Sequence, residues 1–249
     1  MDSKPLRKII GCIRKAVDDY GMISEGDRIG VGLSGGKDSL VLTAALAFYR
    51  RFSPVKFQLH AINIDMGFKG IEKEREALSR LMEELEVPYH TVKTDIAEVV
   101  FDVRKESNPC SLCSKMRRGA LNGKCVELGL NKLALGHNAD DLVETFFLSM
   151  IYEGRLNTFQ PVSYMSRTGI TLIRPLIYVD EADIKGATVR AGLTPLPNPC
   201  PENHHTEREH IKDIIRSVQE EIPIAKDRIL SALTSPERYS LLPPKKTKH

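Results

Sequence analysis

The sequence of 249 residues contains no tryptophan, few aromatic residues and only five cysteines. It has no run of about 18 apolar residues and no apolar segment behind a basic N-terminus, so we expect neither a membrane-spanning helix nor a secretory signal. An odd cysteine count with a single Cys-x-x-Cys pair suits a metal or redox site in a reduced compartment better than a set of disulfides. We therefore expect a cytoplasmic protein. A formal net charge of +3 is too small to indicate nucleic-acid binding by itself.

The most informative stretch is the hexapeptide 34–39, which reads Ser-Gly-Gly-Lys-Asp-Ser and lies between apolar runs at 28–33 and 40–46. This order predicts a strand, a tight glycine turn and a helix. Two glycines leave the amides of the turn open to an anion, and the first turn of a helix directs unpaired N–H groups and a partial positive charge at the same point. Lys37 adds a full positive charge, so the hexapeptide is expected to bind phosphate.

Two common glycine loops fit this stretch poorly. A Walker A loop is excluded because Val31 and Asp38 stand where that loop needs a glycine and a Ser or Thr. Three glycines do match the spacing of a dinucleotide-binding loop, with Asp65 as the acid for a ribose. Such a site has no need of a lysine and an aspartate after the last glycine, whereas a site that cleaves a nucleoside triphosphate uses both.

The hexapeptide resembles the loop of the PP-loop ATPase superfamily, whose members adenylate a substrate and release pyrophosphate. The resemblance implies ATP as a cofactor. The alternative is a strand-to-helix turn with incidental polar residues.

Strand and helix patterns alternate along the chain and predict an α/β fold with a doubly wound, mostly parallel five-stranded sheet. The strands are expected at 28–33, 55–65, 89–95, 133–136 and 172–177, and the helices at 5–20, 38–46, 71–86, 140–152, 206–221 and 224–233. We divide the chain into an N-terminal helix (1–24), a PP-loop ATP-binding catalytic domain (25–200) and a helical C-terminal extension with a basic, disordered tail (201–249).

Three cysteines form the second informative pattern. Cys110 and Cys113 lie in a turn that enters a helix, and Cys200 lies in a proline-rich turn whose rigidity can place one thiolate. A redox pair, half of a zinc site and part of an iron-sulfur site compete as interpretations. The redox pair is disfavoured because the motif lies beyond the third strand of a nucleotide-binding sheet. A structural zinc site needs a second ligand pair, and the sequence has none at the usual spacing, although His204 and His205 follow Cys200 and keep this interpretation open.

Most of the chain resembles the iron-sulfur PP-loop enzymes that thiolate tRNA to 2-thiocytidine. The matching motifs are the hexapeptide, Cys110-Ser111-Leu112-Cys113, Arg117-Arg118-Gly119, Leu135-Gly136-His137, Asp140-Asp141, Arg174-Pro175-Leu176, Glu181 and Cys200. The resemblance implies that a base carbonyl is adenylated with release of pyrophosphate and that sulfur is then transferred at a 4Fe-4S cluster. It assigns Cys110, Cys113 and Cys200 as the cluster ligands. Cys125 lies in a helical stretch and is expected to pack in the core.

Two departures leave the acceptor base open. No second cysteine follows Cys200, and the form His137-Asn138-Ala139-Asp140-Asp141 is nearer to enzymes that thiolate uridine, which add zinc fingers that this chain does not have. A uridine is therefore one alternative acceptor. A PP-loop ligase without sulfur chemistry, such as a lysidine-forming enzyme, is a second alternative, and a nucleotide-binding sensor without turnover is a third.

The motifs give a set of candidate site residues. We expect Asp38 and Asp141, with Asp140 nearby, to hold Mg²⁺ on the leaving pyrophosphate, and Lys37 to stabilise charge at the α-phosphate. Catalytic roles are assigned to Lys37, Asp38, Arg117, Asp140 and Asp141. ATP contacts are assigned to Ser34, Gly35, Gly36, Lys37, Asp38, Ser39, Ile64, Asp65, Gly136 and His137; a structural role for His137 is an equal alternative.

The expected partners are tRNA and a sulfur donor, either a cysteine desulfurase or sulfide. Lys115, Arg117 and Arg118 beside the cysteines can bind tRNA phosphate, with a solvated helix face as the alternative. The resemblance also implies a homodimer. No membrane partner is expected.

Overall fold

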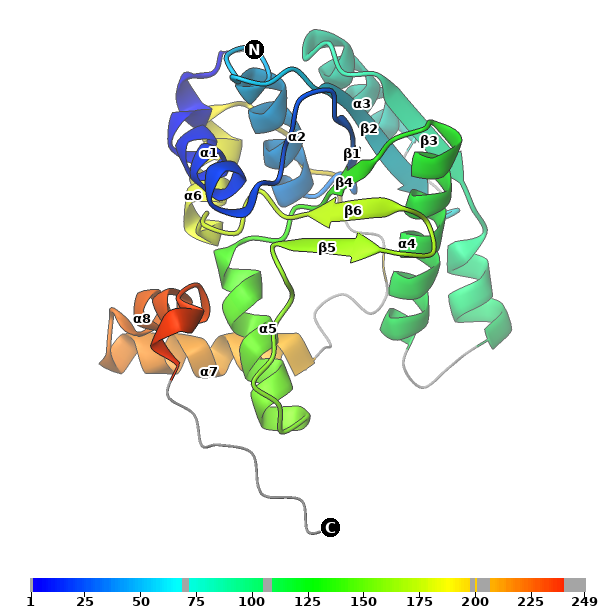
Figure 1. The fold of residues 1–249 in the computed structure, drawn as a ribbon. Coiled ribbons are helices and arrows are strands. Elements are labelled where there is room, and N and C mark those ends of the chain that lie inside the picture. The colour runs from blue at the N-terminus through cyan, green and yellow to red at the C-terminus, as the bar shows by residue number, and fades with distance from the viewer. Residues whose placement is uncertain (1, 69–71, 105–108, 198–199, 201–206, 240–249) are drawn as a thin grey trace, which may run out of the picture. The chain divides into compact units, whose positions relative to one another are not determined.

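The computed structural model describes residues 2–68, 72–104, 109–197, 200 and 207–239. They contain one sheet with the strand order β3-β2-β1-β4-β6-β5 (Figure 1). Its strands are β1 (Arg28–Gly32), β2 (Gln58–Asp65), β3 (Tyr89–Lys93), β4 (Lys132–Ala134), β5 (Val162–Met165) and β6 (Ile170–Ile173). All neighbouring strands pair in parallel except β5, which is antiparallel to β6. The predicted α/β class and mostly parallel sheet are confirmed.

The prediction of five strands is wrong by one. The edge strand β5 is four residues long and forms a hairpin with β6 through a turn in which Gly169 has φ +70°. The strand predicted at 172–177 also begins two residues earlier, and it ends at Ile173. The residues after Ile173 turn away because Pro175 has no N–H to donate to a neighbouring strand.

Helices fill the connections between the strands. The α-helices are α1 (Arg7–Tyr20), α2 (Lys37–Tyr49), α3 (Glu72–Glu84), α4 (Pro109–Glu127), α5 (Ala139–Tyr152), α6 (Glu181–Arg190), α7 (Glu207–Glu221) and α8 (Ala225–Leu233). Short turns of other helix types occur at Lys4–Leu6, Glu98–Arg104 and Pro236–Arg238. Gly21 caps α1 in the left-handed conformation at φ 59°, as its position predicts. Helix α6 was not expected.

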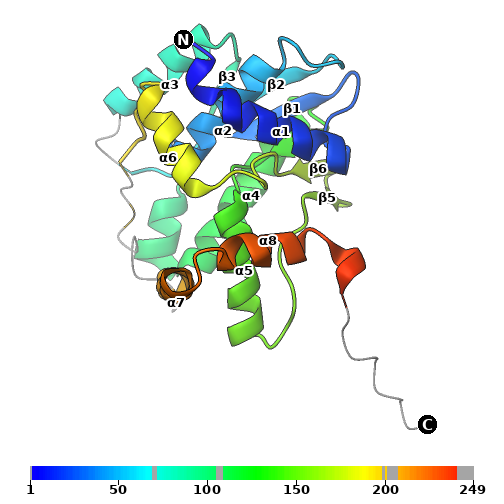
Figure 2. The same cartoon turned by 90° about the vertical axis from the view of Figure 1, so that its left-hand side faces the viewer.

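The core explains why α2 is apolar on every side. From Ser39 to Tyr49 every residue of α2 is buried, because the helix lies between the sheet and the helices α1 and α6 (Figures 1 and 2). Helix α4 packs on the other face of the sheet, against β2, β4 and β6. Cys125 of α4 is fully buried there among Ile62, Leu130 and Leu133, which confirms its predicted packing role.

The chain forms two compact units. One consists of residues 1–140 and 159–204 and contains the sheet; the other consists of residues 141–158 and 205–249. The second unit contains most of α5 together with α7 and α8, and Val143, Ile211 and Ile215 form a buried apolar cluster in it. The division into 1–24, 25–200 and 201–249 stays a prediction. In the part of the chain that the structure describes, no helix is long and apolar enough to cross a membrane.

Candidate functional site

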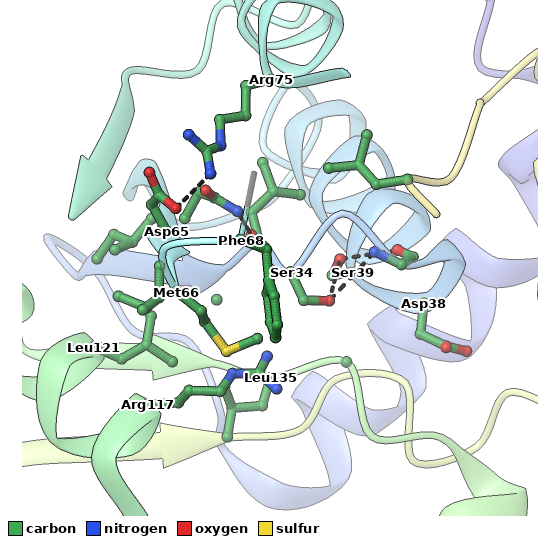
Figure 3. A pocket seen from close by; sticks show the side chains of 18 of the residues that line it. Ser34, Asp38, Ser39, Asp65, Met66, Phe68, Arg75, Arg117, Leu121 and Leu135 are labelled. Carbon is green, nitrogen blue, oxygen red and sulfur yellow. Dashed lines mark hydrogen bonds and ion pairs between the residues drawn. The ribbon is translucent and has the colours of Figure 1, made fainter. Parts of the chain in front are cut away.

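A cavity of about 430 Å³ opens at the carboxyl ends of β1, β2 and β4 (Figure 3). In an open α/β sheet this edge is where ligands bind. The structure brings many of the predicted site residues together in its wall: Ser34, Gly36, Asp38, Ser39, Ile64, Asp65, Arg117, Gly136 and His137. Leu196 and Pro197, which precede Cys200 in the sequence, complete the wall.

The glycine turn has the geometry of an anion site. Gly35 has φ +84°, and its carbonyl accepts the Leu196 N–H at 2.9 Å. A Cβ on Gly35 would lie 2.5 Å from Leu196 Cδ1, so only glycine fits beneath Leu196. Helix α2 begins directly after Gly36 and no side chain caps it in the described residues. Its first N–H groups therefore stay available to an anion.

Lys37 lies between two carboxylates. Its Nζ is 3.0 Å from Asp38 Oδ2 and 2.9 Å from Glu181 Oε1, and Lys185 approaches the other oxygen of Glu181 at 3.0 Å. Burial alone would raise the pKa of Glu181, but the hydrogen bonds from Lys37 and Lys185 outweigh it and lower the pKa to about 2. Burial likewise disfavours the charged form of Lys37, and the two carboxylates overcome it and raise its pKa. Glu181 is therefore a partner of Lys37 in the predicted phosphate site, a role that sequence reasoning did not give it.

Asp38 is positioned by the loop that follows β4. Asn138, which is buried, donates from Nδ2 to Asp38 Oδ1 at 3.1 Å. Gly136 permits this approach because a Cβ there would lie 3.2 Å from the carbonyl carbon of Asp38. Asn138 is a second site residue that sequence reasoning did not assign.

The two predicted acidic residues at the start of α5 have different partners. Asp140 accepts the backbone N–H of Glu181 at 2.7 Å and so caps the first turn of α6. Asp141 belongs to the other compact unit, where Arg208 Nη1 lies 3.3 Å from its Oδ1 and 2.9 Å from Glu144 Oε2. The predicted Mg²⁺ ligation by Asp38 and Asp141 stays a prediction.

The end of β2 supplies a polar and an apolar wall. Asp65 accepts the Gly67 N–H at 2.9 Å and pairs with Arg75, which also lines the cavity (Figure 3). Ile64 and Phe68 add apolar surface beside this pair. A wall of this kind suits a nucleoside, whose base is flat and apolar and whose sugar is polar. Arg75 was not expected.

The three cysteines assigned as ligands lie in one neighbourhood. Burial raises the pKa of the Cys113 thiol, Arg117 opposes this effect, and Cys200 and Cys110 add to it, so the three sulfur atoms interact electrostatically. Cys113 Sγ lies 3.9 Å from the sulfur of Met66, which lines the cavity. Within the described residues no three His, Cys, Asp or Glu side chains are close enough to hold a metal ion. His204 and His205 lie outside those residues.

Helix α4 connects the cysteines with the cavity. It carries Cys110 and Cys113 in its first two turns and Arg117 one turn later, where Arg117 lines the cavity. Lys115 and Arg118 are exposed on the same helix. His137 packs its ring against Phe159, with centroids 5.1 Å apart.

Known proteins are similar to this chain in sequence and in architecture. The PP-loop domain family matches residues 7–229. The tRNA-cytidine(32) 2-sulfurtransferase of Syntrophotalea carbinolica is 35% identical over 245 residues, covering 97% of this chain and 94% of the relative. The protein of the same name from Pelobacter propionicus is 36% identical, with 95% and 88% covered. Among solved structures, the U34-tRNA thiolase NcsA from Methanococcus maripaludis with its 4Fe-4S cluster has a TM-score of 0.77 and 26% identity, covering 95% of this chain and 81% of that one.

Proposed function

This chain belongs to the PP-loop family and, within it, to the tRNA-cytidine 2-sulfurtransferases, and we propose that it thiolates a cytidine of tRNA in an ATP-dependent reaction. One observation carries the proposal. Met66 lines the cavity and touches the thiol of Cys113, so Cys113 lies directly behind the cavity wall. An activated base in the cavity would therefore lie next to the group that supplies sulfur.

The first step uses the residues of the glycine turn. The carbonyl oxygen of the base forms a bond to the α-phosphorus of ATP, and the bond from that phosphorus to the β-phosphate oxygen breaks, releasing pyrophosphate. Lys37 and the amides of Gly35 and Gly36 stabilise the charge that develops on the phosphates. Asp38, held by Asn138, would bind Mg²⁺ on the leaving pyrophosphate.

The chemistry of the donor set beside the cavity is that of an iron-sulfur site. The set consists of the thiols of Cys110, Cys113 and Cys200, and soft thiolates are the ligands that such clusters take. Cys110, Cys113 and Cys200 would hold a 4Fe-4S cluster, as the related thiolase does in its structure. When bound, the cluster would supply an iron without a protein ligand, where sulfur for transfer can bind. Arg117 lines the cavity on helix α4 and would hold the AMP phosphate as AMP leaves the base.

Two observations keep uridine open as a second possible acceptor base. The structural relative acts on U34, and Asn138 gives this chain the uridine-type motif. Uridine is therefore the alternative acceptor. The sulfur donor (a cysteine desulfurase or sulfide) and the homodimer remain predictions. A tRNA substrate and cysteines that must stay reduced both favour the cytoplasm as the place of action.

The test is anaerobic thiolation of tRNA with ATP and sulfide, followed by mass spectrometry of the nucleosides. We expect 2-thiocytidine in the treated tRNA. Detection of 2-thiouridine would instead identify uridine as the acceptor base.

Two variants separate the two halves of the site. Lys37→Ala should lose pyrophosphate release and keep its iron, because the lysine acts on phosphate alone. Cys200→Ala should lose iron and thiolation and keep tRNA-dependent pyrophosphate release.

The matched control is Cys12→Ala, which changes a cysteine outside the predicted ligand set and should keep both activities. Zinc without iron in the wild-type protein would contradict the proposal. So would the same pattern of losses in the Lys37 and Cys200 variants.

A further inference from the structure

Phe68 places an aromatic ring in the wall of the cavity at the carboxyl ends of the strands. It stands three residues after the end of β2, and its side chain lines the cavity together with that of Met66 (Figure 3). The ring is half-buried, and among the described residues that line the cavity no other is a phenylalanine, tyrosine or tryptophan. A flat apolar ring in a cavity wall offers a surface on which another flat ring can stack.

Hydrogen bonds fix the backbone that carries this ring. The side chain of Asp65 accepts the Gly67 N–H at 2.9 Å, and the carbonyl oxygen of Met66 accepts the Ala97 N–H at 2.9 Å. Gly67 has φ +89°, a conformation that glycine adopts readily and other residues rarely do. The loop 65–68 is therefore held by contacts within the protein, and these contacts set the position of the ring.

The ring lies on the side of the cavity that is formed by α4. It packs against Phe101, with ring centroids 6.3 Å apart, and the turn Glu98–Arg104 that contains Phe101 packs against α4. The sulfur of Met66, two residues before Phe68, is 3.9 Å from Sγ of Cys113 on α4. One short loop therefore carries both the aromatic ring and the contact with a cysteine of the expected ligand set.

Two nucleobases have to enter the cavity, and only one of them has to reach this side. The phosphates of ATP are expected at the glycine turn, and Ile64 and Asp65 are the expected contacts of its adenosine. The acceptor base must lie between the α-phosphate and the cysteines, because it first bonds to the phosphate and then receives sulfur. The loop that contacts Cys113 is therefore the part of the wall that the acceptor base meets.

We propose that Phe68 stacks on the acceptor base of tRNA and holds it between the α-phosphate and Cys113. This inference rests on the proposed function, because it takes a tRNA base as the substrate. Proteins that recognise RNA commonly stack the unpaired bases of its loops on aromatic side chains. Every base has a flat face, so stacking serves cytidine and uridine alike. The ring would thus fix where the base lies and not which pyrimidine it is.

The test compares the full-length protein with variants of Phe68 in tRNA-dependent pyrophosphate release at saturating ATP. Phe68→Ala should lower kcat/KM for tRNA roughly tenfold or more, the effect of one lost stacking contact. Phe68→Tyr keeps a flat ring and should retain most of the rate. Phe68→Leu keeps apolar bulk without a flat ring, so it should lose about as much as Phe68→Ala, and it tests the ring even where the alanine variant does not fold. Wild-type rates in the leucine variant would overturn the proposal.

Binding of ATP separates the acceptor base from adenine. Calorimetry without tRNA should give the wild-type affinity for ATP in all variants of Phe68. A loss of ATP affinity that matches the loss of rate would assign the ring to adenine and overturn the proposal. Phe52→Ala, which removes an exposed phenylalanine that follows α2, is the matched control and should leave both measurements unchanged.

A further arm needs no tRNA. Saturation-transfer NMR with cytidine and a non-hydrolysable ATP analogue should show transfer to the base protons of cytidine in the wild-type protein and in Phe68→Tyr, and much less in Phe68→Ala. Equal transfer in the wild-type protein and Phe68→Ala would reject the stacking site. Cytidine binding that depends on Phe68, in a wild-type protein that does not thiolate tRNA, would contradict the proposed function and leave the stacking site standing.

Discussion

At the scale of single residues, Lys37 shows how the site stabilises a partly buried positive charge. A lysine without a partner in this half-buried position would be destabilised by burial, and Asp38 and Glu181 remove that cost. We expect the oxygens of a bound triphosphate to take over the role of these carboxylates. Glu181 is also held by Lys185 and by the cap that Asp140 provides to α6. It is therefore available as a fixed partner for Lys37 in the absence of nucleotide.

We predict that Glu181→Gln lowers the free energy of unfolding at pH 7 by about 1–2 kcal/mol, because two charge-assisted hydrogen bonds are lost. The folded-state pKa of Glu181 is about 2, below its ordinary value of 4.5. The stabilisation is therefore complete above pH 4.5 and disappears as the pH falls toward 2. Urea unfolding at pH 7 and at pH 3 measures the difference between wild type and variant, which should shrink at pH 3. Glu127→Gln, which changes an exposed partner of Lys124, is the control and should have little effect.

Gly35 is the second residue whose identity is dictated by geometry. A side chain there would adopt a positive φ, which costs about 1–2 kcal/mol, and would also collide with Leu196. We predict that Gly35→Ala destabilises the protein by at least this amount and weakens ATP binding, measured by thermal unfolding and calorimetry.

Gly11→Ala is the matched control. Gly11 is in the middle of α1 with open space around it, so alanine should stabilise by about 0.5–1 kcal/mol. Equal effects at the two glycines would contradict the geometric argument.

At the scale of elements, the sequence was sufficient for the parallel core of the sheet. Strands β1 and β2 are buried over most of their length and contain short apolar runs, and helices such as α1 show clear periodicity. The edge strand β5 was missed because four residues with mixed burial carry little pattern, and its pairing depends on the turn at Gly169. Helix α6 was missed because its buried residues Ile184, Ala187 and Thr188 form a weak apolar stripe interrupted by Gly186.

The same contrast holds for the candidate site. The hexapeptide 34–39 was recognised because its chemistry is local: glycines, a lysine and a helix start are adjacent in the sequence. Glu181, Asn138 and Arg75 were not assigned as site residues because their partners are distant in the sequence. Lys37 and Glu181, for example, meet only because α6 packs against α2. Pairings of this kind depend on tertiary packing, which a single sequence does not specify.

Two neighbouring histidines on the paired strands β2 and β3 make the stability of the fold depend on pH. His60 and His90 lie on these strands with Nδ1 and Nε2 3.1 Å apart and with stacked rings. Burial lowers the pKa of both, and nearby cations act in the same direction: Arg28 and Arg50 on His60, and Lys124 on His90, where Glu127 opposes. Because the folded-state pKa values are depressed, the neutral pair stabilises the fold above about pH 6.5, and this stabilisation is lost as the pH falls.

We therefore predict that stability decreases between pH 7 and pH 5 and that His90→Gln reduces this decrease, because one of the two partly buried imidazoles no longer has to take up a proton. Chemical unfolding at several pH values measures the slope of the free energy against pH. His210→Gln, which changes an exposed histidine on α7, should leave the slope nearer to that of the wild-type protein. An identical slope in the His90 variant and the wild-type protein would show that the pair does not titrate in this range.

At the scale of the whole molecule, the chain builds its second compact unit from two separate segments. Residues 141–158 and 205–249 make up this unit, and its buried apolar residues are few. Arg208 of α7 links the segments through Glu144, Asp141 and Thr145 of α5, at 2.9, 3.3 and 3.3 Å. With a small core, the unit depends strongly on this polar contact.

We predict that Arg208→Ala destabilises this unit selectively, on the order of 2 kcal/mol, because Glu144 is left buried without its cation. Hydrogen exchange followed by mass spectrometry should show backbone amides of α7 and α8 exchanging at least roughly tenfold faster. Amides of β1, β2 and β4 should keep their wild-type rates. Arg208→Lys should keep part of the protection, since lysine keeps the positive charge but cannot make the two-pronged contact of the guanidinium. Arg216→Ala, which removes an exposed pair with Asp213 on the same helix, is the control and should change little. Acceleration spread evenly over both units would show instead that they unfold as one.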